Sequence, residues 1–157
     1  MNRAKLVPAL QLSLRAAAAA GLSLAFAQLL QLQYPLYAMI AAVIVTDLSP
    51  AETRKLGWRR LAGTVLGTVV GIVLSLLLPP GVWTMTLGIF LTMFLMHLLG
   101  LPEAARIAGY LCALVLLEHG ADAPLYAFWR FVETVLGIGV AFVVSLVPKL
   151  MSSADKP

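Results

Sequence analysis

The chain is a series of long apolar runs, which short polar or proline-containing segments interrupt. No charged residue lies between Arg15 and Asp47, and none lies between Arg60 and Glu103. A helix needs about 20 apolar residues to cross a bilayer, so each of these two intervals has room for a helical hairpin. The apolar runs are continuous and do not alternate with period two, which favours helices over the strands of a barrel.

Prolines and polar breaks divide these runs into six predicted membrane-spanning helices. Pro35 interrupts the first interval, the Pro79-Pro80 pair interrupts the second, and the segments GLPEAAR and HGADAP bound a shorter fifth helix. The predicted helices are 10–32, 35–48, 59–78, 83–100, 103–119 and 126–148. They form one domain over residues 1–150, with halves 1–80 and 81–150, and a short cytoplasmic tail follows at 151–157.

The segment LSPAETRKLGWRR, residues 48–60, predicts a short separate helix on the cytoplasmic side. Ser49-Pro50 followed by Glu52 is typical of a helix start. We expect Arg54 and Lys55 to face lipid phosphates, although gathering an anionic substrate is an alternative role.

Composition supports a membrane protein. Hydrophobic residues make up 61% of the chain and charged residues 11%, against about 25% charged in soluble domains. The net charge of +4 therefore indicates topology and does not point to nucleic acid. With six helices and a cytoplasmic N-terminus, ten of the 11 Lys and Arg residues fall on the cytoplasmic side, as the positive-inside rule requires. Both termini are then cytoplasmic, in a bacterial-type inner membrane.

We expect neither an enzyme nor a metal or cofactor site. The sequence has no pairing of nucleophile and base and no converging ligand set. Glu118, His119 and Asp122 lie close in sequence, but adjacent positions on a helix do not converge on one metal ion. The single cysteine, Cys112, lies in an apolar run and is interpreted as a core residue.

The third and sixth predicted helices match each other when the chain is shifted by 70 residues. Nine of the 21 positions from 59 to 79 are then identical, including Arg60 with Arg130 and Gly67 with Gly137. An odd number of spans separates these two helices, so they cross the membrane in opposite directions. This predicts an all-helical fold with a 3+3 inverted repeat, an architecture of transporters. The sequence match covers one helix in each half.

Small residues recur at every fourth position of both matched helices, which places them on one face of each helix. The residues concerned are Gly63, Gly67, Gly71, Gly137 and Ala141. Such a face allows two helix backbones to approach closely, and it can also line a narrow path. The hydroxyl groups of Thr64 and Thr134 either contact a permeating molecule or bond back to their own helices.

Arg60 and Arg130 are predicted at the N-terminal ends of the matched helices. A guanidinium beside a helix N-terminus attracts anions. The alternative for Arg60, next to Arg59, is a side chain that reaches the lipid headgroups. Arg130 stands on the side that otherwise lacks basic residues, which favours an anion path or an interior ion pair.

Two ionisable residues within the predicted spans are candidates for proton coupling. Glu133 lies one turn into the sixth helix, where ionisable groups are costly. It either exchanges a proton or forms a local ion pair with Arg130. His97 is interpreted either as a core histidine or as a proton relay.

The chain resembles the fusaric acid resistance-like family, which includes bacterial aromatic acid exporters. The residues that carry the resemblance are Thr46-Asp47, Arg54, Arg60, Gly63-Thr64, Gly67 and Gly71, with a weaker second motif in WRFVETVLGIGVA. The resemblance covers residues 32–150, and plant aluminium-activated malate transporters look like relatives with the same six-helix block.

The resemblance implies export or conductance of organic anions, often aromatic carboxylates. It also implies a homodimer, because larger members carry two six-helix blocks. Tyr110 and Trp129 could stack on an aromatic substrate, although Trp at a membrane boundary is ordinarily an interfacial anchor. The alternatives are a channel without proton coupling and a membrane subunit that packs against a partner without transporting.

Overall fold

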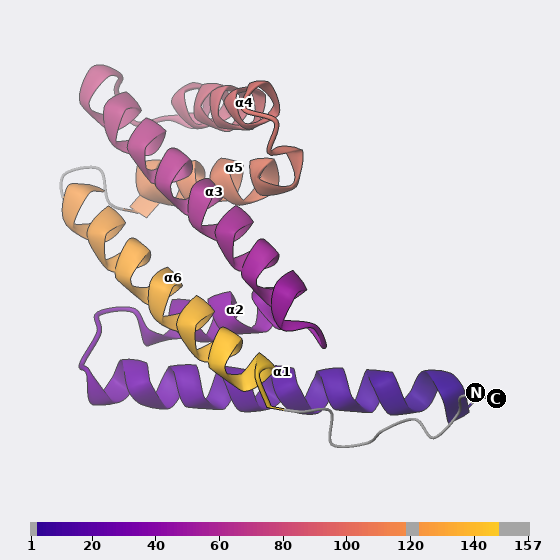
Figure 1. The fold of residues 1–157 in the computed structure, drawn as a ribbon. Helices are drawn as coiled ribbons and strands as arrows, with labels where there is room; N and C mark the ends of the chain where they lie inside the picture. Colours follow the sequence, from indigo (N-terminus) through magenta and orange to yellow (C-terminus); the bar gives the residue numbers. More distant parts are fainter. Residues whose placement is uncertain (1–2, 119–122, 148–157) are drawn as a thin grey trace. The chain divides into compact units, whose positions relative to one another are not determined.

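The computed structural model describes residues 3–118 and 123–147 of the chain, and these residues form six helices (Figure 1). The helices are α1 (Arg3–Leu29), α2 (Pro35–Val45), α3 (Pro50–Leu77), α4 (Val82–Leu98), α5 (Pro102–Glu118) and α6 (Ala123–Ser145). The predicted all-helical class and the number of helices are confirmed for this part of the chain. The tail 151–157 and the loop containing His119 and Asp122 lie outside it.

The breaks between helices have local chemical causes. Leu101 N–H bonds to the Met96 carbonyl and Gly100 N–H to the His97 carbonyl, and Gly100 has a φ of 71°. This is the Schellman arrangement that ends a helix, and glycine adopts its left-handed residue without strain. Pro102 then starts α5, at a position where the missing proline N–H is not needed.

The first hairpin uses the same device. Leu32 N–H bonds to the Ala27 carbonyl and Gln31 N–H to the Gln28 carbonyl, with Gln31 at a φ of 51°. A non-glycine residue costs about 1–2 kcal/mol in this conformation, and the hydrogen bonds that end α1 offset part of that cost. Pro35 then begins α2, as the sequence predicts.

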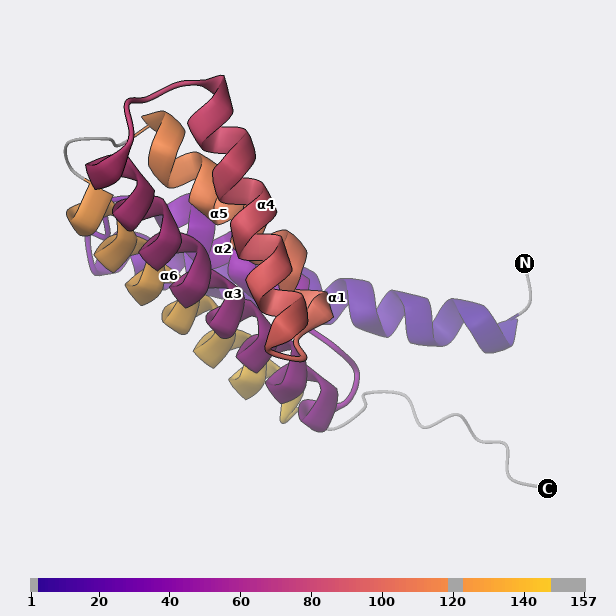
Figure 2. The ribbon, with the colours of Figure 1, turned by 90° about the horizontal axis from the view of Figure 1, so that it is seen from above.

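The described residues fall into two compact units. The first unit contains α1, α2, the start of α3 as far as Gly57 and the end of α6 from Leu136; the second contains the rest. The α1–α2 pair packs within the first unit and the α4–α5 pair within the second, where Figure 2 shows α4 alongside α5. These units cut across the predicted halves, because α3 and α6 each contribute to both.

The prediction of a separate cytoplasmic helix at residues 48–60 is wrong. α3 begins at Pro50 and continues without a break to Leu77, a length of 28 residues. Nothing between these positions stops it: the segment contains no internal proline, and Thr53 N–H bonds to the Ser49 carbonyl at 3.0 Å to start the first turn. The prediction placed the start of the third span after the charged residues, but the helix runs through those residues.

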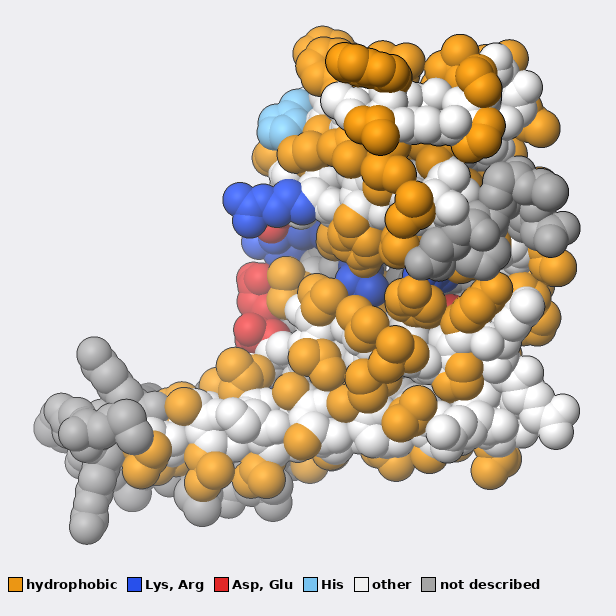
Figure 3. All heavy atoms as spheres, turned by 180° about the vertical axis from the view of Figure 1, so that it is seen from behind, with side chains coloured by type: hydrophobic (Ala, Val, Ile, Leu, Met, Phe, Trp, Pro, Cys, Tyr) orange, Lys and Arg blue, Asp and Glu red, His pale blue; other side chains and the backbone are white. Residues whose placement is uncertain are grey.

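Three described helices are long and apolar enough to cross a membrane: Leu6–Leu29 of α1, α3 and α6. α2 has 11 residues and is about 16 Å long, roughly half the hydrocarbon thickness of a bilayer. α4 and α5 have 17 residues each, the lower limit for a spanning helix. Hydrophobic side chains cover much of the face in Figure 3, which is consistent with a multi-pass membrane protein.

Candidate functional site: a buried arginine cluster

The second unit contains five ionisable or hydroxyl side chains that lie together, and we call them the arginine cluster: Arg60, Tyr110, Tyr126, Arg130 and Glu133. Arg60, Tyr126, Arg130 and Glu133 are at most 3% exposed, whereas Tyr110 is 39% exposed. The cluster therefore extends from the interior of the unit to its surface at Tyr110.

Helical spacing on α6 organises half of the cluster. Tyr126 and Arg130 are four residues apart, so their side chains share a face. Arg130 Nε donates a hydrogen bond of 2.7 Å to the Tyr126 hydroxyl, and its guanidinium lies 4.8 Å from the centre of the Tyr126 ring. Glu133 lies three residues beyond Arg130, with its Oε2 4.0 Å from Arg130 Nη1. The predicted local pair of Arg130 and Glu133 is thus present, at the outer limit of an ion-pair distance.

Arg60 brings a second positive charge to the cluster from α3. Tyr110 of α5 and Arg130 of α6 lie close enough to its guanidinium to interact with its charge. Its Nε and Nη1 atoms are buried and have no hydrogen-bond partner among the described residues. A buried donor without a partner costs about 1–3 kcal/mol, and more on a charged group. Arg60 therefore has hydrogen-bonding capacity that the described protein does not use.

The predicted position of both arginines at helix N-termini is wrong. α3 begins at Pro50 and α6 at Ala123, so Arg60 and Arg130 follow the helix starts by ten and seven residues. Only the first four N–H groups of a helix lack an internal partner. The helix dipole is felt mainly within the first turn, and it does not explain an anion site at either arginine. The charge of the side chains themselves must supply the attraction.

The charges of the cluster do not balance. Two guanidinium groups stand against one carboxylate, which leaves a net charge of +1 when Glu133 is ionised. A buried charge without a counterion is expensive, and in a membrane-spanning segment it is a mark of function. Planar guanidinium groups bind carboxylates and phosphates in a bidentate manner. The arrangement is suited to holding one additional anionic group.

The other predicted site residues lie around this cluster or away from it. The Thr64 hydroxyl donates its proton to the Arg60 carbonyl at 2.9 Å, so it has no proton left for an anion. Thr134, which follows Glu133 in the sequence, is buried. The ring of Trp129 contacts the ring of Phe128 in an edge-on arrangement. His97 is exposed at the end of α4, where its Nδ1 meets the Met93 carbonyl at 2.7 Å.

The glycine face of α3 lies directly against α5 within the second unit. A Cβ atom built on Gly67 would be 2.5 Å from the Ala108 carbonyl oxygen and 2.9 Å from Ala108 Cα. Gly63 faces Ile107 and Ala104 in the same way, and Gly71 faces Val115 and Cys112. This close approach of α3 and α5 places Arg60 of α3 and Tyr110 of α5 in the same region of the second unit.

The matching face of α6 lies against α2 within the first unit. A Cβ atom on Gly137 would be 2.7 Å from Ala41 Cβ and 3.0 Å from the Ala42 nitrogen. Ala141 is fully buried in a cluster with Ala19, Ala42 and Val45. The small residues of both matched helices therefore serve close helix packing.

Sequence reasoning missed two buried residues with clear roles. Tyr126 is 2% exposed and accepts the Arg130 hydrogen bond, and its spacing of four from Arg130 was a usable signal. Arg15 is 9% exposed and donates hydrogen bonds to the carbonyls of Leu48 and Val147. No local pattern predicts those partners, which lie 33 and 132 residues away along the chain.

Comparison with known protein families gives a match. The family described as fusaric acid resistance protein-like matches residues 22–144, which is more than half of the chain. Neither the curated proteins nor the solved structures that were compared include a match. The chain belongs to the fusaric acid resistance protein-like family, a family of membrane transporters.

Proposed function

We propose that this family member exports organic anions, with aromatic carboxylates as the favoured substrate class, and that the anion binds at the arginine cluster. The observation that carries the proposal is the net positive charge buried around Arg60 and Arg130. An anion at this position neutralises that charge and accepts hydrogen bonds from Arg60 Nε and Nη1, which have no partner among the described residues.

Tyr110 supports the choice of an aromatic carboxylate. It lies close enough to Arg60 to interact with its charge and is partly exposed, so its ring borders the cluster on the accessible side. A substrate with a carboxylate at Arg60 would place its ring beside the Tyr110 ring, and aromatic pairs of this kind contribute about 0.5–1.5 kcal/mol beyond the area they bury. The preference for aromatic substrates otherwise rests on the family resemblance.

The proposed architecture is six spans arranged as an inverted repeat of three helices. Adding 70 to the bounds of α2, Pro35–Val45, gives 105–115, which lies inside α5. The contacts follow the same shift. Gly67 packs on Ala108, and Gly137 packs on Ala38 and its neighbours; the shift of 70 residues relates Gly67 to Gly137 and Ala38 to Ala108. These correspondences extend the repeat from one helix to two in each half and support a transporter fold.

We place the protein in a bacterial-type inner membrane with both termini in the cytoplasm. The distribution of Lys and Arg supports this orientation, although Arg15 and Arg60 are buried and do not act as simple topology signals. The working assembly is proposed to be a homodimer, on the strength of the two-block members of the family.

Glu133 is the proposed proton-coupling group. When Glu133 is ionised, it competes with the substrate for Arg130. Glu133 Oε2 lies 4.0 Å from Arg130 Nη1. Protonation of Glu133 removes this internal anion and leaves two guanidinium groups for the substrate. Coupled movement of a proton together with an organic anion then follows, because a proton on Glu133 and an anion at the guanidinium groups favour each other's binding. His97 is less well placed for this role, because it is exposed at the end of α4.

The test is flux of an aromatic carboxylate such as benzoate from liposomes that contain the purified protein, with and without a pH gradient. We expect Arg60→Gln to abolish most of the flux. Arg59→Gln is the matched control: Arg59 is the neighbouring arginine on the same helix, and it pairs with the exposed Glu103. Glu133→Gln should keep flux down the substrate gradient and lose its response to pH.

The results also separate the alternatives. Native flux that does not respond to pH would favour a channel, and Glu133 would then be only an internal counterion. Absence of flux for all organic anions tested, from folded protein, would favour a non-transporting packing subunit. The close helix contacts at Gly67 and Gly137 are compatible with that second function.

A further inference from the structure

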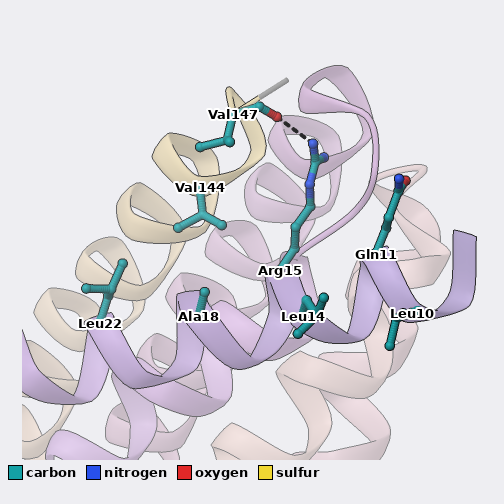
Figure 4. Close-up of a pocket in the computed structure, with 8 residues that line it drawn as sticks. All are labelled: Leu10, Gln11, Leu14, Arg15, Ala18, Leu22, Val144 and Val147. Atoms are coloured by element: carbon teal, nitrogen blue, oxygen red, sulfur yellow. Dashed lines mark hydrogen bonds between the residues drawn. The ribbon is translucent and has the colours of Figure 1, made fainter. Parts of the chain in front are cut away.

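An apolar groove of about 540 Å³ lies in the first unit between α1 and the end of α6 (Figure 4). Its lining residues are Leu10, Gln11, Leu14, Arg15, Ala18, Leu22, Val144 and Val147. The groove follows α1 from Leu10 to Leu22, a length of about 18 Å. This is an elongated apolar surface with a single charged residue, Arg15.

Arg15 is held in place but keeps hydrogen-bonding capacity. Figure 4 shows its side chain reaching from α1 to the Val147 carbonyl, and Nη1 donates to the Leu48 carbonyl at 3.0 Å. A guanidinium has five N–H donors, of which these two bonds use two. Among the described residues no carboxylate forms an ion pair with Arg15. Its charge therefore faces the groove without a counterion from that part of the chain.

The partners of Arg15 also fix its level along the helices. Leu48 follows the end of α2 at Val45, and Val147 follows the end of α6 at Ser145. α6 is long enough to cross a membrane, so its end lies near the lipid headgroups. On one side of Arg15, Ala18 and Leu22 continue the apolar groove along α1 for about 10 Å toward the interior of the bilayer.

We propose that this groove binds an anionic phospholipid, with the phosphate against Arg15 and one acyl chain along Ala18, Leu22 and Val144. Arg15 has no carboxylate partner among the described residues, and apolar walls continue along α1 beyond it. The charge and the apolar walls match the two parts of such a lipid. Basic pockets between membrane helices on the cytoplasmic side bind anionic headgroups by the same chemistry. This site is separate in its residues from the arginine cluster, and it does not depend on the proposed transport function.

The test measures phospholipid that stays bound during purification. The protein is reconstituted with equal amounts of phosphatidylglycerol and phosphatidylcholine of identical acyl chains, extracted in mild detergent, and analysed by mass spectrometry for lipid retained per protein. We expect phosphatidylglycerol to be enriched about fivefold, the preference that one basic residue at a membrane surface gives. Ala18→Phe should remove most of the retained phosphatidylglycerol by filling the groove, while leaving the bonds of Arg15 intact.

The matched control is Ala17→Phe, which puts the same side chain on the neighbouring exposed position of α1, outside the groove. It should retain lipid as the native protein does, and Leu22→Trp should behave like Ala18→Phe. Equal retention of the two lipids by the native protein would overturn the proposal. It would also be overturned if Ala18→Phe left lipid unchanged and altered the oligomeric mass, because the groove would then be an interface between copies.

Discussion

Gly67→Ala offers the sharpest test of the close contact between α3 and α5. The added methyl group would meet the Ala108 carbonyl oxygen at 2.5 Å and Ala108 Cα at 2.9 Å, both of them backbone atoms. A side chain could turn aside, but a helix backbone cannot, so the two helices would have to separate. Gly139→Ala is the matched control, because a Cβ atom at Gly139 would have nothing within 4 Å.

The expected magnitude follows from two opposing effects. Replacing glycine by alanine in a helix stabilises it by about 1 kcal/mol, and this gain applies to both variants. Overpacking costs about 1–3 kcal/mol, and only Gly67→Ala carries that cost. The difference between the two variants in the free energy of unfolding should therefore be about 1–3 kcal/mol, with Gly67→Ala the less stable.

The assay is reversible unfolding in mixed micelles, with denaturing detergent added in steps and helix content followed by circular dichroism. The native protein, Gly67→Ala and Gly139→Ala are compared under identical conditions, so the common gain in helix propensity cancels between the variants. If Gly67→Ala proved as stable as Gly139→Ala, or more stable, α3 and α5 would not be in backbone contact at Gly67, and the account of the small-residue face would fail.

Three further substitutions test individual hydrogen bonds in the same assay. Tyr126→Phe keeps the ring beneath Arg130 but removes the acceptor of its 2.7 Å bond, and we expect a loss of about 1–2 kcal/mol; an unchanged stability would refute this role for the hydroxyl. Arg15→Met removes two bonds to backbone carbonyls and should lower stability by about 2–4 kcal/mol, whereas a smaller loss than for Tyr126→Phe would contradict the anchoring role. Thr53→Val removes the acceptor of the Asp47 N–H at 3.0 Å and should cost about 1 kcal/mol; a variant as stable as the native protein would contradict a stabilising role for this bond.

The helix breaks could be predicted because their causes are local. Pro35, Pro79-Pro80 and the GLP segment before Pro102 each stop or start a helix through the geometry of a few neighbouring residues. The predicted third helix began nine residues too late, at 59 instead of Pro50. The error came from treating charged residues as the boundary of a span, although Arg and Glu are compatible with a continuing helix.

The environment of the arginines could not be predicted, because it depends on contacts between distant segments. Arg60 and Arg130 were singled out by the repeat, but their burial follows from α5 and α6 supplying Tyr110 and Tyr126. In the sequence Arg15 is only the boundary of a charge-free interval, yet in the structure it ties α1 to the carbonyls of Leu48 and Val147. Periodicity identifies which face a residue occupies and does not identify its partner.

Stability alone does not explain why the arginine cluster exists. Apolar residues of similar volume often replace a buried ion pair without loss, and in a membrane the desolvation of charge is still more costly. The cluster goes further than a pair, because Arg60 adds a second cation and leaves Nε and Nη1 without partners among the described residues. A structure that needed only to fold would gain from an uncharged residue at position 60. The cost of burying the Arg60 charge is explained if an anion occupies the cluster during part of a transport cycle. Arg60→Gln should then give a protein that is more stable than the native protein and inactive in transport. A variant that was less stable and still transported would reverse that reasoning.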